Sequence, residues 1–142
     1  MSDTAQIEQE FIMWLATKGI RTLHVRLNNY QISGVLTTIR ATQPLPQAPN
    51  QFWFDVSGSQ DDWPEALVFL CGSTRHFFAL KAQDLKHALN SLDVPRATRT
   101  GRYLFRLDIG SKLLIAREVE TADFGKFYNT LDIFTQTSSG SS

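Results

Sequence analysis

Four strand-length segments decide the fold, and they read VLTTI (35–39), FWFDV (52–56), ALVFLC (66–71) and HFFAL (76–80). Each is rich in β-branched or aromatic residues, and Pro, Gly, Asn or Ser residues separate them, which is typical of strands. A segment with helical periodicity precedes this series and another follows it. The sequence therefore predicts one α+β domain with a mixed central sheet flanked by helices.

The flanking segments indicate which elements surround this sheet. Residues 5–18 carry apolar side chains at helical spacing, and Gly19 supplies a helix stop. Residues 21–27 alternate, with Leu23, Val25 and Leu27 on one face, which predicts a half-exposed strand. The other expected elements are a strand pair over 30–40 bent at Ser33-Gly34, a helix over 82–92, a strand over 103–109 with a partner over 112–116, and apolar residues at helical spacing over 122–134.

Proline and glycine positions predict the connections. Three prolines make residues 43–51 a loop, which we expect to join two neighbouring strands. Residues 72–75 have the composition of a hairpin turn. Residues 135–142 are rich in Ser, Thr and Gly and contain no apolar anchor, so we expect a disordered tail after a single domain over 1–134.

The composition is that of a packed globular protein. Of the 142 residues, 42% are hydrophobic, which argues against a disordered chain. The longest apolar run, 66–71, is far too short to cross a bilayer, and the N-terminal residues lack the pattern of a secretory signal. Cys71 is the single cysteine, and its apolar surroundings predict a buried thiol. We therefore expect a cytoplasmic protein with no membrane partner.

The charge is balanced overall but unevenly distributed. The chain has 14 basic and 14 acidic residues, yet residues 72–112 contain eight basic against three acidic ones. An acidic cluster of Asp55, Asp61, Asp62 and Glu65 lies just upstream. Such asymmetry allows a basic face on a neutral protein, and the fixed fork of an arginine suits phosphate contacts. The candidate residues for binding nucleic acid are Arg40, Arg96, Arg99, Arg102 and Arg106.

Several common catalytic motifs are absent from the sequence. It contains no lysine-tethered phosphate loop, nucleophile elbow, HExxH helix or paired CxxC motif. His24, His76 and His87 stand apart, without carboxylates at the spacing of a metal-ligand set. The residues alone therefore predict neither serine-hydrolase chemistry nor a resident metal or cofactor.

The order of elements carries one resemblance to a known family. Glu8 and Glu10 lie on the first expected helix, and Thr38-Ile39-Arg40 ends a strand at the place of an (E/Q)-x-K motif. The strands that follow fit the same layout, as do the closing residues Phe127-Tyr128-Asn129. In these respects the chain resembles the PD-(D/E)XK, or restriction-endonuclease-like, superfamily, especially its small Holliday-junction-resolvase-like and Mrr-like members.

The resemblance implies a restriction-endonuclease-like fold in which carboxylates hold Mg²⁺ and a lysine assists the attacking water. Here Thr38 replaces the carboxylate, and Arg40 replaces the lysine but cannot lose its proton. No acid stands between Glu10 and Asp55, where Gln31 is the nearest polar residue. The resemblance thus implies a degenerate active site, with Mg²⁺ as a cofactor only if the protein cleaves DNA. The remaining catalytic candidates are Glu8, Asp55 and Arg40.

These observations lead to three hypotheses for function. The first is a non-catalytic nuclease-fold protein that binds nucleic acid or a partner protein through Arg40 and residues 96–106. The second is an active Mg²⁺-dependent DNA endonuclease with relocated acidic residues, which would join the first helix to Asp55. The third is a protein-interaction subunit, or a homodimer formed through an exposed strand edge at 103–109, with no role in nucleic-acid binding.

Each candidate residue also has a simpler role. Glu8 and Glu10 can be solvated acids on a helix, and Asp55 can point outward from an alternating strand. Trp53 and Phe54 fit core and edge packing as well as they fit a platform for stacking bases. The sequence leaves these alternatives open.

Overall fold

The computed structural model describes residues 3–116 and 120–135. Its helices are α1 (Asp3–Thr17), α2 (Ala82–Ser91) and α3 (Asp132–Thr135), and its 3₁₀ turns are η1 (Gln60–Asp62) and η2 (Gly125–Phe127). Its strands are β1 (Thr22–Arg26), β2 (Asn29–Ile32), β3 (Val35–Thr42), β4 (Gln51–Val56), β5 (Ala66–Cys71), β6 (Phe77–Lys81), β7 (Tyr103–Asp108), β8 (Leu113–Ala116) and β9 (Glu120–Asp123). The expected α+β class in a single domain is confirmed.

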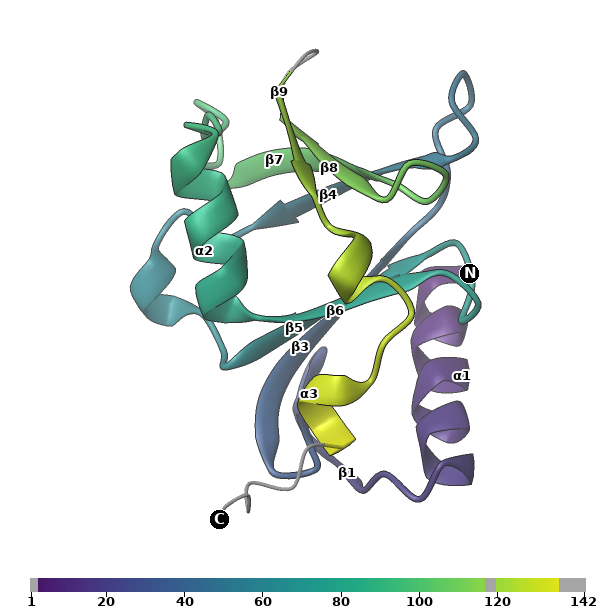
Figure 1. Ribbon diagram of the computed structural model, residues 1–142. Helices are drawn as coiled ribbons and strands as arrows, with labels where there is room; N and C mark the ends of the chain where they lie inside the picture. The colour runs from purple at the N-terminus through teal and green to yellow at the C-terminus, as the bar shows by residue number, and fades with distance from the viewer. Residues whose placement is uncertain (1–2, 117–119, 136–142) are drawn as a thin grey trace.

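The strands form two sheets (Figure 1). The mixed sheet has the order β1-β2-β3-β5-β6, in which only β3 and β5 run parallel. The antiparallel sheet has the order β4-β7-β8-β9. The mixed sheet is as predicted, whereas the second sheet is not, because the proline-rich loop over 43–51 carries the chain from one sheet to the other. The prediction that this loop joins neighbouring strands is therefore wrong.

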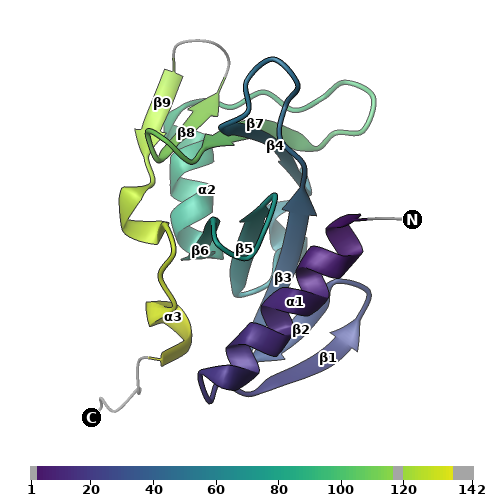
Figure 2. The ribbon, with the colours of Figure 1, turned by 90° about the vertical axis from the view of Figure 1, so that its right-hand side faces the viewer.

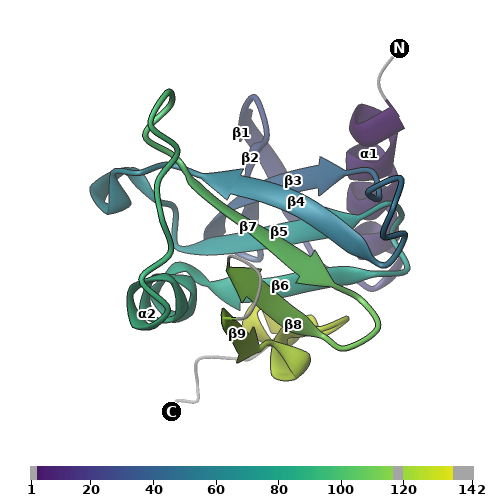
Figure 3. The ribbon, with the colours of Figure 1, turned by 90° about the horizontal axis from the view of Figure 1, so that it is seen from above.

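Strand β5 is buried along its whole length because both of its faces are covered. On one face lies α1, which crosses the mixed sheet (Figure 2). Its buried side chains Ile7, Phe11 and Leu15 recur every four residues, so they form one stripe facing the sheet. On the other face lie the antiparallel sheet and α2 (Figure 3).

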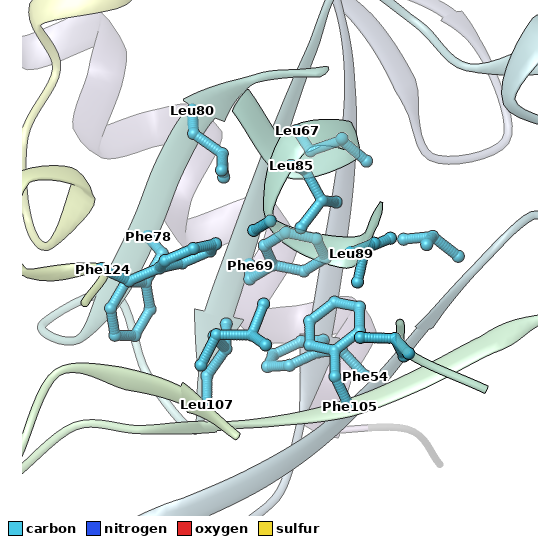
Figure 4. Packing of buried hydrophobic residues seen from close by; sticks show 14 of the residues in the cluster. Phe54, Leu67, Phe69, Phe78, Leu80, Leu85, Leu89, Phe105, Leu107 and Phe124 are labelled. Carbon is cyan, nitrogen blue, oxygen red and sulfur yellow. The ribbon is translucent and has the colours of Figure 1, made fainter. Parts of the chain in front are cut away.

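The larger core fills the space between the two sheets and α2 (Figure 4). Phe69 is central, since its ring lies 4.9 Å from that of Phe54 and 5.6 Å from that of Phe105. These three rings come from β5, β4 and β7, so the aromatic cluster joins the mixed sheet to the antiparallel one. Cys71 lies in the same core, where burial raises the pKa of its thiol, as expected for an unreactive cysteine.

Strand β1 presents the opposite face from the one its pattern predicts. Leu23 and Val25 are 63% and 48% exposed, and Leu27, which follows the end of β1, is 74% exposed. The face turned toward α1 instead carries His24, whose ring lies 5.0 Å from that of the buried Tyr30. The helix covers that side of the sheet, whereas the second sheet reaches only the strands farther from β1.

Strand β7 is not an edge, because β4 pairs along one side of it and β8 along the other. β7 is thus an inner strand and not the exposed edge expected at 103–109, while formation of a homodimer stays a prediction. The edge strands of the mixed sheet are β1 and β6, and those of the antiparallel sheet are β4 and β9. Along β6, the amide of Asn129 donates to the carbonyl of Phe77 at 2.7 Å, so the C-terminal segment covers part of that edge.

The C-terminal segment is less helical than its spacing suggests. Residues 122–134 contain the end of β9, then η2, and only then the start of the single-turn α3. Asp123 accepts a hydrogen bond from the amide of Gly125, and Asn129 has a φ of 52°, so the chain turns twice where a helix would continue. Of the expected tail, residues 136–142 lie outside the described residues.

Within residues 3–116 and 120–135, no helix combines the length and the apolar character that crossing a membrane requires.

Candidate functional site

An ion-pair cluster joins the two sheets on the side away from α1. One oxygen of Asp55, on β4, lies 2.6 Å from the Arg40 guanidinium on β3. The other oxygen lies 3.1 Å from Nε of Arg102, in the loop before β7. All three side chains are about one-third exposed, between 31% and 35%. Two guanidinium groups from distant parts of the chain therefore hold one carboxylate at the surface.

Strand alternation places these side chains. Arg40 follows the buried Ile39, which faces α1, so the Arg40 side chain points to the other face of the mixed sheet. Asp55 lies between the buried Phe54 and Val56 and points away from the core of the antiparallel sheet. The prediction that Asp55 points outward is correct, and the outward direction is the one that brings it to Arg40.

Two further residues of the site lie beside Arg40. Asn29 and Thr38 stand opposite each other in the β2–β3 ladder, and the Thr38 hydroxyl lies 2.5 Å from the Asn29 side-chain oxygen. Nearby, the indole nitrogen of Trp63 donates to the carbonyl of Ser57 at 2.9 Å. These groups surround a surface cavity of about 260 Å³, whose lining residues are Asn29, Thr38, Arg40, Asp55, Val56, Ser57, Asp62, Trp63, Pro64, Leu67 and Arg102.

The donor set of this cavity is a poor fit for the Mg²⁺ that the superfamily resemblance implies. Its carboxylates are those of Asp55 and Asp62, and both oxygens of Asp55 already face guanidinium groups. Mg²⁺ and Ca²⁺ prefer several oxygen ligands with net negative charge, whereas the cavity lining carries as many cations as anions. Among the described residues, no group of three or more His, Cys, Asp or Glu side chains could hold a metal ion.

Glu8 lies apart from Asp55. It accepts a hydrogen bond of 2.7 Å from the Tyr30 hydroxyl on the α1 side of the mixed sheet. Burial, followed by this hydrogen bond and the negative charge of Glu8, raises the pKa of Tyr30 to about 12. Glu8 lines a second cavity, which shares Arg40 with the first, so the catalytic candidates Glu8 and Asp55 face different cavities.

The remaining arginine candidates lie in the loop before β7 and on β7 itself. Arg96 lies with its guanidinium carbon 5.8 Å from the Tyr103 ring, and Arg99 is exposed. The amide of Ala97 donates to the carbonyl of Arg102 at 2.8 Å, which closes the loop that carries Arg99. Arg99 thus lies in the same loop as Arg102, which pairs with Asp55.

Arg106 lies further along β7, opposite Trp53 on β4. Its guanidinium carbon is 5.5 Å from the Trp53 ring, and one nitrogen donates to the Gln51 side-chain oxygen at 2.9 Å. Trp53 and its neighbour Leu104 remain 45% and 40% exposed. For the proposal below, we group Arg40, Arg96, Arg99, Arg102, Arg106 and Trp53 under the name arginine face.

Sequence reasoning missed Asn29, Ser57 and Trp63 as parts of the site. Asn29 belongs to an Asn28-Asn29 pair that is typical of a turn, and its position opposite Thr38 follows only from the β2–β3 register. Gln31, taken as the nearest substitute for the missing acid, instead stands opposite Leu36 and lies outside the lining of the cavity. Phe54 is a core residue, whereas Trp53 is exposed, so the two aromatic candidates have different roles.

Comparisons of the chain with protein-family models, with curated proteins and with solved structures found no match.

Proposed function

We propose that the arginine face binds the phosphate backbone of a nucleic acid and that the protein does not cleave it. The proposal rests on the two ion pairs in which Arg40 and Arg102 each bind one oxygen of the Asp55 carboxylate. A phosphate offers oxygens at comparable spacing, and guanidinium forks recognise carboxylates and phosphates by the same geometry. The Asp55 carboxylate would then occupy, in the free protein, a position that suits a backbone phosphate.

The rest of the arginine face supports the same ligand. Arg96 and Arg99 extend the positive charge along the loop before β7, where they are exposed to solvent. The partly exposed Trp53, with Arg106 against its ring, offers a surface on which an unpaired base can stack. Phosphate contacts supply affinity without sequence preference, so we expect binding that depends on salt more than on sequence.

We propose binding without cleavage because of the side chains that line the cavity beside Asp55. Asn29 and Thr38 contribute a neutral amide and a hydroxyl, and Arg40 cannot serve as a general base. A degenerate member of the restriction-endonuclease-like superfamily would have this combination, which is why we keep that resemblance as part of the proposal. In such a degenerate member, the DNA-binding surface would be retained although catalytic activity has been lost.

The test is equilibrium binding of the purified protein to labelled single-stranded, duplex and branched DNA at low and high salt. We expect salt-sensitive binding to at least one DNA form and intact DNA when Mn²⁺ is added. The variant Arg96→Glu with Arg99→Glu should bind at least about tenfold more weakly. The control Arg75→Glu with Lys126→Glu makes the same charge change at exposed positions outside the face and should bind normally.

Two results would overturn the proposal. Absence of binding at low salt would remove nucleic acid as the ligand. Cleavage with Mn²⁺ that is lost in Asp55→Ala would instead establish the metal-dependent nuclease.

A further inference from the structure

Strand β1 is an edge of the mixed sheet, and within the described residues no other strand pairs along its outer side. The amide of Ser33 donates to the carbonyl of Arg21 at 2.8 Å, so Arg21 and Ser33 form a hydrogen-bonded pair of the β1–β2 ladder. Because hydrogen-bonded and non-hydrogen-bonded positions alternate, Thr22 and His24 direct their backbone N–H and C=O groups away from β2. These groups can accept an added strand.

The side chains of this edge are unusually apolar. Edge strands in monomeric proteins are commonly protected by charges, prolines or a covering segment. Here Leu23, Val25 and Leu27 expose most or about half of their surface. Leu36, in the row of the sheet that contains Leu23, adds a fourth partly exposed apolar side chain.

A cavity lies beside β1 on each face of the sheet. The cavity on the α1 side is about 440 Å³ and is lined by Glu8, Gln9, Ile12, Thr22, His24, Leu27 and Tyr30, with the Glu8 carboxylate bonded to the Tyr30 hydroxyl. The cavity on the other side is also about 440 Å³, and its lining includes Leu23, Gln31 and Gly34. An added strand projects alternate side chains to the two faces, so each cavity would receive side chains from one segment.

The charge of this edge selects the occupant. Arg21 and Arg26 are exposed at the two ends of β1, and no acidic residue occurs between Glu10 and Asp55 in the sequence. A second copy of β1 would therefore add two more arginines to this edge and no acidic residue to pair with them. An extended segment with acidic residues at both ends of an apolar centre would complement the edge.

We propose that β1 docks an extended segment of a partner protein, which adds a strand to the mixed sheet. Its backbone pairs with Thr22 and His24, its apolar side chains enter the two cavities beside β1, and its acidic residues face Arg21 and Arg26. Trp53 and Arg106 of the arginine face lie on the other sheet, whereas Arg40 lies on β3, which β2 separates from β1 in the mixed sheet.

The test is selection of binding sequences from a displayed library of short random peptides, using the whole chain as bait. We expect enriched peptides to alternate apolar residues and to carry Asp or Glu near both ends. Leu23→Ser with Val25→Ser, and separately Arg21→Glu with Arg26→Glu, should each weaken the selected peptide at least about tenfold. Leu104→Ser removes a comparable exposed leucine from the antiparallel sheet and should leave peptide binding unchanged.

Amide hydrogen exchange distinguishes backbone pairing of the peptide with β1 from contacts made by side chains alone. The amides of Thr22 and His24 should exchange more slowly in the presence of the selected peptide. The proposal is overturned if no peptide is enriched, if the enriched peptides lack acidic ends, or if these two amides are unaffected. Self-association of the peptide-free chain that the β1 variants abolish would show that a second copy occupies the edge instead.

Discussion

The guanidinium of Arg40 lies 2.6 Å from the carboxylate of Asp55, and this contact joins the mixed sheet to the antiparallel one at the surface. Arg102 completes the cluster from the other side of the carboxylate. Since all three side chains are about one-third exposed, solvent weakens the pairing, and we expect it to contribute modestly to stability. In the proposed function, the Asp55 carboxylate occupies the position of a phosphate between the two arginines in the free protein.

Replacement of Asp55 by Asn should separate stability from binding. Asp55→Asn removes the shared anion, so we expect the free energy of unfolding to fall by about 1 kcal/mol. The same change frees Arg40 and Arg102 for phosphate, and DNA should bind severalfold more tightly. Fluorescence anisotropy with labelled DNA measures the affinity, and Glu10→Gln, on the exposed side of α1, is the control for the loss of one negative charge. Weaker DNA binding in Asp55→Asn would contradict the proposed role of the carboxylate.

The aromatic cluster between the sheets should dominate stability. Phe69 is fully buried against Phe54 and Phe105, so Phe69→Ala should lower the free energy of unfolding by about 3–5 kcal/mol. Trp53→Ala removes a larger side chain from the exposed face of β4 and should cost only about 1 kcal/mol. Urea unfolding followed by circular dichroism measures both. Equal losses in the two variants would contradict the packing described between the sheets.

Asn129 should hold the C-terminal segment against β6. Its side-chain oxygen accepts from the Phe77 amide at 2.9 Å, and its side-chain nitrogen donates to the Arg75 carbonyl at 2.7 Å. Asn129→Ala removes both bonds and should cost about 1–3 kcal/mol. Asn129→Asp keeps the acceptor and should cost less. If urea unfolding shows no difference between wild type and Asn129→Ala, the segment is held by other contacts.

The burial of Tyr30, together with its hydrogen bond to Glu8, should produce a stability loss at high pH. The pKa of Tyr30 rises from 10.0 to about 12 on folding, so its contribution is complete below pH 10 and disappears as the pH rises toward 12. Tyr30→Phe should lose stability less steeply than wild type over that interval, and Glu8→Gln should bring the pKa of Tyr30 back toward 10. Tyrosinate absorbance and unfolding at each pH test this. A wild-type Tyr30 that ionises near pH 10 would contradict the geometry at Glu8.

Local patterns predicted most elements of the fold, because strand propensity and turn residues act over short distances. The hairpin at 72–75, the helix over 82–92 and the strand over 103–109 all appear at the expected places. The partition into two sheets did not follow, since nothing local indicates which strands pair across the 43–51 loop. The exposed leucines of β1 show the same limit, because alternation identifies two faces without telling which one a distant helix covers.

The site was partly predicted for a related reason. Arginine content indicated the basic residues, and the structure brings Arg40 and Arg102 together on Asp55. That meeting joins residues far apart in sequence, as does the register that places Asn29 opposite Thr38. The sequence therefore singled out Asp55 and the arginines separately but not the ion pairs that join them.

The most direct test of the proposed function is the salt dependence of DNA binding in wild type and in Arg96→Gln with Arg99→Gln. Counterion release makes the logarithm of the binding constant fall linearly with the logarithm of salt concentration, by about 0.9 for each phosphate contact. If both arginines contact phosphates, the slope of the double variant should be smaller in magnitude by about 2. Binding with the same slope in both proteins, or no binding at low salt, would contradict a phosphate-binding role for the arginine face.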